Sequence, residues 1–113
     1  MTSHIPEYTD ADCERVLARE FPGDAAEEAR AVLRGYGRES GHCSPLRVRM
    51  ACLKLAAGDL ARLQEYVRAA CGDPRDVLAW GEYGHSWNAK GAADKKAARQ
   101  RDWHELREWL ARE

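Results

Sequence analysis

The chain has 113 residues, of which 18 are Lys or Arg and 19 are Asp or Glu, so its formal net charge is −1. This length is typical of a single domain with one hydrophobic core. The small net charge argues against a protein built to coat nucleic acid or an anionic membrane. We therefore expect one domain over residues 1–113.

The sequence predicts a cytoplasmic protein that has no membrane partner. No apolar run reaches the roughly 18 residues that a membrane-spanning helix requires. The first residues also lack the basic start and apolar stretch of a secretory signal. Ala is abundant and Arg outnumbers Lys, a usage that is typical of GC-rich bacterial genomes.

Residues that favour the start or the end of a helix occur along the whole chain. Pro6 breaks any early helix, so residues 1–8 are expected to be a flexible tail. Thr9 is placed to cap the first helix, and Ser44, Asp59 and Asp73 are placed to cap later ones, because short polar side chains accept hydrogen bonds from first-turn amides. The predicted helices cover residues 10–21, 24–34, 45–57, 59–71, 74–82 and 92–112.

Glycines mark several of the predicted boundaries. Gly58 and Gly72 precede the helices at 59–71 and 74–82, where a left-handed glycine can end the preceding helix. Pro45 and Pro74 suit first helical positions, because the amide that proline lacks has no partner there. These signals give helices that follow one another closely between residues 44 and 82.

The helix at 45–57 is expected to lie at the centre of the fold. Between Val48 and Ala57 only Arg49 and Lys54 are charged, and a helix that is apolar nearly all round belongs inside a bundle. No segment alternates as a strand would. We predict an all-α fold, a compact bundle of five to six short helices, with these interior residues: Val16, Leu17, Leu33, Leu46, Met50, Leu53, Leu63, Val67, Val77 and Leu106.

The last helix is divided in composition. Its first half is Ala and basic residues, a pattern typical of a solvated face that Asp94, Asp102 and Glu105 dilute. Its second half places Trp103 and Trp109 on either side of a stripe centred on Leu106 and Leu110. Since a Trp side chain buries on the order of 200 Å², the two tryptophans are expected to dock this helix on the bundle.

Charge is also divided along the chain. Residues 1–30 carry eight acids and three arginines, a local charge of −5, and residues 31–60 carry five bases and two acids, or +3. One interpretation is a solvated acidic face. The other is a contact between the two segments, within one chain or across a dimer.

The four cysteines are expected to be structural thiols. Cys13, Cys52 and Cys71 fall on or beside apolar helix faces, where a free cysteine behaves as a small hydrophobe. Among scattered candidates, Cys43 with His42 or His85 is the best match to a nucleophile and its base, although adjacent loop residues rarely form such a pair. No paired ligand spacing indicates a metal, so no metal, no cofactor and no catalytic residue is predicted.

The loop at 81–91 is the candidate binding site. Tyr83, His85, Trp87 and Asn88 place aromatic, titratable and amide groups on a glycine-rich segment, and such loops often carry binding residues. Trp and Tyr are also favoured anchors in protein interfaces. The alternative is that Trp87 folds back and covers the helix at 74–82.

These observations favour a non-enzymatic interaction or regulatory module that binds a protein partner or a second copy of itself. One alternative is a small-molecule or phosphate-binding protein, with or without enzymatic activity, that uses His85 with the central arginines Arg47 and Arg49. A pocket joining these groups would favour it. A second alternative is a weak nucleic-acid binder, for which the sequence provides no phosphate loop and no stacking motif.

Overall fold

The computed structural model describes residues 7–37, 44–86 and 89–112, and these residues form six helices and no strand. The all-α prediction is confirmed, and each predicted helix ends within one residue of the observed one at either end. The helices are α1 (Asp10–Glu20), α2 (Ala25–Leu33), α3 (Pro45–Ala56), α4 (Leu60–Gly72), α5 (Pro74–Glu82) and α6 (Ala92–Ala111).

Three of the predicted caps form. The Thr9 hydroxyl accepts a hydrogen bond from the Asp12 amide at 3.1 Å, and the Asp12 carboxylate accepts one from the Thr9 amide at 3.0 Å. Asp59 and Asp73 likewise accept hydrogen bonds from first-turn amides of α4 and α5. Each bond satisfies an amide that has no partner within its own helix.

Two of the predicted boundaries are wrong in detail. Ser44 lies at the N-cap of α3 in a left-handed conformation, so its side chain makes no capping hydrogen bond. Gly72 is the last residue of α4, and the extended backbone of Asp73 ends that helix instead. Gly58 does adopt the left-handed conformation, with φ +82°, and it follows Ala57, whose φ is also positive.

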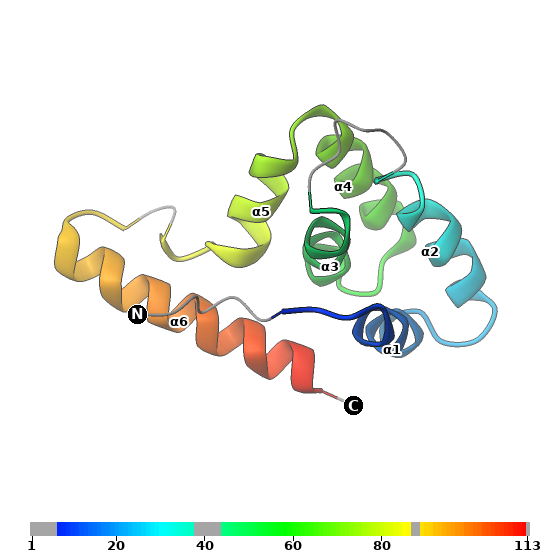
Figure 1. Ribbon diagram of the computed structural model, residues 1–113, viewed down its shortest axis with the longest axis horizontal. Coiled ribbons are helices and arrows are strands. Elements are labelled where there is room, and N and C mark those ends of the chain that lie inside the picture. Colours follow the sequence, from blue (N-terminus) through cyan, green and yellow to red (C-terminus); the bar gives the residue numbers. More distant parts are fainter. Residues whose placement is uncertain (1–6, 38–43, 87–88, 113) are drawn as a thin grey trace.

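Helix α3 is the centre of the bundle, as its composition predicts. It packs against α1, α4 and α5, and Figure 1 shows it end-on with these helices around it. Its buried residues lie on several sides of the helix: Val48, Met50, Ala51, Cys52, Leu53 and Ala56.

Nine of the ten predicted interior residues are buried: Val16, Leu17, Leu33, Met50, Leu53, Leu63, Val67, Val77 and Leu106. The exception is Leu46, which is half-buried. It lies in the first turn of α3, next to the exposed residues Ser44 and Pro45, where fewer neighbouring helices enclose it.

Helices α3 and α5 are joined by a close approach and an ion pair. A side chain at Gly81 would place its Cβ 3.0 Å from the Cβ of Ala51, closer than nearly all Cβ contacts in proteins, so glycine suits this approach. One turn away, Arg47 donates three hydrogen bonds of 2.6–3.0 Å to the carboxylate of Glu82. The Glu82 side chain is 1% exposed, and a buried carboxylate requires such a partner.

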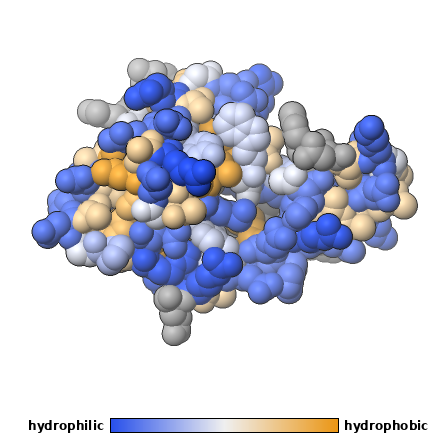
Figure 2. Space-filling model, turned by 180° about the vertical axis from the view of Figure 1, so that it is seen from behind, coloured by the Kyte–Doolittle hydropathy of each residue, from blue (hydrophilic) through white to orange (hydrophobic). Residues whose placement is uncertain are grey.

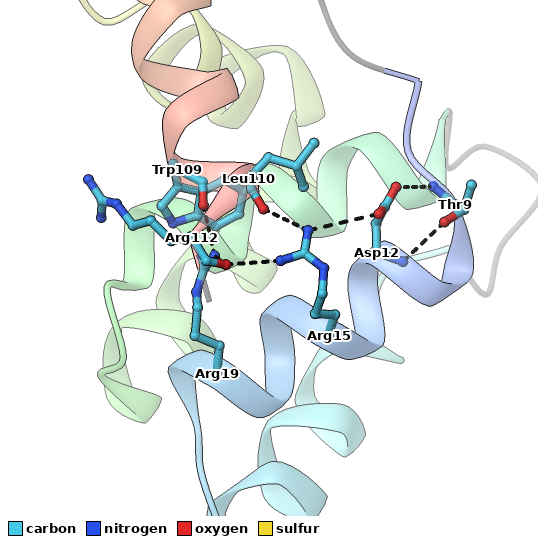
Figure 3. A network of polar contacts seen from close by, with 7 residues as sticks. All are labelled: Thr9, Asp12, Arg15, Arg19, Trp109, Leu110 and Arg112. Atoms are coloured by element: carbon cyan, nitrogen blue, oxygen red, sulfur yellow. Dashed lines mark hydrogen bonds and ion pairs between the residues drawn. The ribbon is translucent and has the colours of Figure 1, made fainter.

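The C-terminal end of α6 is held by two arginines of α1 (Figure 3). Arg15 donates hydrogen bonds to the carbonyls of Leu110 and Arg112 at 2.6 and 3.0 Å. Arg19 donates to the carbonyls of Trp109 and Arg112 at 2.8 and 2.7 Å, and its guanidinium lies 5.2 Å from the centre of the Trp109 ring. Cations that bind the last carbonyls of a helix also match its dipole.

The molecule is elongated, with extents of 44 × 32 × 25 Å. In Figure 1 the start of α6 and helix α2 lie at opposite ends of the long axis. Figure 2 shows the molecule from behind, with the strongest hydrophobic colouring over the half away from the start of α6.

The chain is held to the body before α1 begins. Tyr8 packs against the hydrophobic core, and its burial raises the pKa of its hydroxyl well above the usual value. The predicted flexible tail otherwise lies largely outside the described residues. No helix of the described part is both long enough and apolar enough to span a membrane.

Candidate functional site

Two of the four predicted site residues lie in a short loop between α5 and α6. Tyr83 ends α5, donating its amide to the carbonyl of Ala79 at 3.0 Å, and His85 follows two residues later. Because α5 includes Gly81 and Glu82, the loop begins at Tyr83 instead of residue 81. Trp87 and Asn88 lie outside the described residues.

Asp102 of α6 fixes this loop. Its carboxylate accepts hydrogen bonds from the amides of His85 and Ser86 at 2.8 and 2.9 Å, and from the Ser86 hydroxyl at 2.7 Å. Asp102 is 5% exposed. Three donors aimed at one carboxylate stabilise it in this position and determine the path of the loop.

The His85 side chain is also held by α6. Its Nε2 atom lies 2.9 and 3.0 Å from the two carboxylate oxygens of Glu105. Asp102 and Glu105 are three residues apart and therefore share one face of the helix. The loop and this face of α6 bring one imidazole and two carboxylates together, with a ligand atom of each within 4.8 Å of the others.

In the alternative small-molecule or phosphate site, His85 acts together with the central arginines Arg47 and Arg49. Arg47 binds Glu82, which raises the pKa of its guanidinium, with a smaller contribution from Tyr83. Arg49 donates hydrogen bonds to the carbonyls of Leu33 and Tyr36. Since His85 binds Glu105, the three groups have separate partners within the fold.

The first half of α6 is a second candidate surface, which we call the basic half (residues 92–101). It carries Lys95, Lys96, Arg99 and Arg101 against Asp94, a local charge of +3. Every residue of it except Ala98 is exposed. None of the four cations makes an ion pair or side-chain hydrogen bond with another residue in the described ranges.

Acidic side chains gather on α1 and α2, at the other end of the molecule. Glu7, Asp10, Asp24 and Glu28 are exposed.

The nearby arginines are engaged within the fold, since Arg15 and Arg19 bind the end of α6. Arg30 donates to Glu14 at 2.8 and 3.0 Å and to Glu27 at 3.0 Å, and its hydrogen bonds lower the pKa of Glu14.

Burial disfavours the thiolate form of two of the described cysteines, Cys13 and Cys52. Burial raises the pKa of the Cys13 thiol to about 11 and that of Cys52 to about 12, and a protonated thiol attacks poorly. Cys71 is exposed in the last turn of α4, and its Sγ atom donates a hydrogen bond to the Gly35 carbonyl at 3.5 Å. His42 and Cys43 lie outside the described residues.

One large apolar side chain of the described residues is exposed. Trp80 of α5 is 44% exposed, and its ring meets the ring of Tyr66 edge-on, with the centroids 6.2 Å apart. A single exposed apolar residue is normal on a monomeric surface. The exposure of Trp80 alone therefore does not indicate a binding site.

Sequence reasoning missed Asp102 and Glu105. The sequence pattern predicts that both charges dilute a solvated basic face, whereas Asp102 is buried and Glu105 binds His85. Their partners lie 16 to 20 residues earlier, in a loop without periodicity. The one available signal was the polar run Gly84-His85-Ser86, a segment that needs polar groups elsewhere to fix it.

Comparisons with protein-family models, with curated proteins and with solved structures returned no match for this chain. The functional argument therefore depends on the geometry and charge of its own residues.

Proposed function

We propose that this protein is a non-enzymatic interaction module and that its partner is an acidic protein surface, contacted by the basic half of α6. The observation that carries the proposal is the set of four exposed cations with no carboxylate partner among the described residues. Complementary charge gives such a surface its association rate and its choice of partner.

The position of two of these cations supports the proposal because it costs stability within the monomer. The N-terminus of a helix carries a partial positive charge, so nearby cations are unfavourable there. Lys95 and Lys96 lie at the end of the first turn and just beyond it, and the N-cap residue, Gly91, provides no capping side chain. Binding of an acidic partner explains why cations lie at a position that is unfavourable for the helix itself.

A second copy of the chain is one partner of this chemistry. The acidic side chains of α1 and α2 and the basic half of α6 lie at opposite ends of an elongated molecule (Figure 1). Two copies arranged antiparallel would place each basic half against the other's acidic helices. Such a two-fold arrangement closes on itself with two equivalent contacts.

Sedimentation equilibrium of the untagged protein at low and at physiological salt tests the proposal. We expect association that salt weakens and that K95Q/K96Q/R99Q/R101Q weakens at least tenfold. The matched control R34Q/R62Q/R68Q/R107Q changes net charge equally at exposed arginines and should associate as the wild type does. D24N/E27Q/E28Q should mimic the basic-half variant when the partner is a second copy.

Two further probes separate this proposal from nucleic-acid binding. A fluorescent poly-glutamate peptide and a single-stranded RNA oligonucleotide are titrated into both quadruple variants and the wild type. Binding of the peptide that depends on the basic half supports an acidic protein partner. The proposal would be overturned if the protein is monomeric and does not bind the peptide, or if it binds the RNA more tightly than the peptide at physiological salt.

A further inference from the structure

The geometry points to a metal site formed by His85, Asp102 and Glu105, which takes a divalent transition ion of the Zn²⁺ class. The site joins the loop that follows α5 to the face of α6 that carries the two carboxylates. It uses none of the cations of the basic half, so it stands independently of the proposed partner.

The ligand set selects the class of ion. Imidazole nitrogen suits Zn²⁺ and its transition-metal neighbours, whereas sites for Mg²⁺ and Ca²⁺ are built from oxygen alone. One imidazole with two carboxylates is a set of mixed nitrogen and oxygen donors. Three protein ligands also leave at least one coordination position for water or a further ligand.

The distances suit a single ion. The Nε2 atom of His85 lies 2.9 Å from the nearer carboxylate oxygen of Glu105. Two ligands that are each about 2.1 Å from one ion and 2.9 Å apart subtend an angle of about 90° at that ion. The three ligand atoms lie within 4.8 Å of one another, so coordination of one ion requires at most a small approach of these side chains.

The three ligands differ in burial and in the number of hydrogen bonds that hold them. Asp102 is buried and held by two amides and a hydroxyl, an arrangement that resembles the hydrogen-bonded carboxylates of metal sites. The side chain of Glu105 is 51% exposed, and that of His85 is 37% exposed. The fixed ligand therefore lies inside, and the two ligands that must adjust lie at the surface.

A second His–Glu pair on α6 provides an internal control. His104 and Glu108 form an exposed ion pair one turn apart. Among the described residues, no third ligand joins that pair in a cluster. If the site needs three ligands, substitution of His85 should weaken metal binding and substitution of His104 should not. If binding is adventitious, the two substitutions should have similar effects.

The test is a titration of Co²⁺ and Zn²⁺ into the purified metal-free protein, followed by the visible spectrum of Co²⁺ and by calorimetry for Zn²⁺. We expect one ion per chain, an affinity at least tenfold lower in H85Q and in E105Q, and no change in H104Q. Circular dichroism confirms that each variant is folded. E105Q alters an exposed residue and keeps the proposal testable if H85Q is unstable.

Stability offers an independent readout, because an ion that binds only the folded state raises the melting temperature. Zn²⁺ should raise it in the wild type and in H104Q but not in H85Q or E105Q. Three results would overturn the site: no ion bound, an affinity in H85Q and E105Q equal to that of the wild type, or a thiolate-to-Co²⁺ charge-transfer band that assigns the ion to cysteine.

Discussion

The two halves of α6 differ in almost every physical respect, although they form one continuous helix. The docked half (residues 102–111) buries Asp102, Leu106 and Trp109 and is held by arginines of α1 (Figure 3). In the basic half only Ala98 is buried. The docked half carries a local charge of −2, and the basic half +3.

This difference indicates which half serves the fold and which is available to a partner. In the docked half, the Asp102 carboxylate and the last carbonyls of the helix have partners within the chain, and removing these contacts should destabilise the protein. In the basic half, the charges lack such partners, and removing them should alter binding alone. The predictions below test this division, beginning with the largest effect on the free energy of unfolding.

The largest loss is expected from Asp102→Ala. The substitution leaves two loop amides and a hydroxyl without their acceptor, and unmet buried donors cost about 1–3 kcal/mol each. Because water can reach part of the loop, we expect a total loss of about 3 kcal/mol in urea denaturation. Asp94→Ala, in the exposed basic half, is the matched control and should change stability by less than about 0.5 kcal/mol. Equal effects of the two substitutions would contradict the division.

A smaller loss is expected from Arg19→Met. This change removes hydrogen bonds to the carbonyls of Trp109 and Arg112 and the cation–π contact with the Trp109 ring. The methylene part of the side chain is retained, so the expected cost is about 2 kcal/mol. Arg99→Met, on the exposed basic half, serves as the control in the same thermal or urea unfolding series. An unaffected Arg19 variant would show that α6 docks through its apolar residues alone.

The four-cation variant K95Q/K96Q/R99Q/R101Q should leave stability nearly unchanged. Exposed charges without partners contribute within about 0.5 kcal/mol, whereas association with an acidic surface should weaken at least tenfold. Calorimetric melting and sedimentation, performed on the same sample, separate the two effects. A large drop in melting temperature would mean that the basic half serves the fold.

The smallest effect is a gain. Lys95→Glu replaces a cation near the start of α6 with an anion, which suits the positive end of the helix dipole. We expect the monomer to be more stable by about 0.5 kcal/mol at low salt, together with weaker binding of an acidic partner. The gain should vanish at high salt, and a loss of stability would show that Lys95 has a structural partner.

The helices and the core could be predicted from the sequence because their determinants are local. The capping residues Thr9, Asp59 and Asp73 mark their helices within a few residues of chain, and the apolar composition of α3 indicates its central position. Leu46 was placed in the interior because periodicity cannot tell where neighbouring helices stop enclosing a helix end.

The candidate site could be predicted only in part. His85 was named, but its partner Glu105 and the buried anchor Asp102 were not, because the contacts depend on how the loop turns back onto α6. The α1 arginines that hold the end of α6 were missed for the same reason, since the residues in contact are 90 or more positions apart. Local patterns therefore located the loop without showing what holds it.

Hydrogen exchange along α6 tests the division between its halves most directly. In dilute protein at physiological salt, we expect amides of residues 102–111 to exchange only when the whole protein unfolds. Those of residues 92–101 should open locally at a much lower free energy. Adding an acidic partner, or raising the protein concentration at low salt, should then slow exchange in the basic half alone. Equal protection of both halves, unchanged by partner, concentration or salt, would contradict the account.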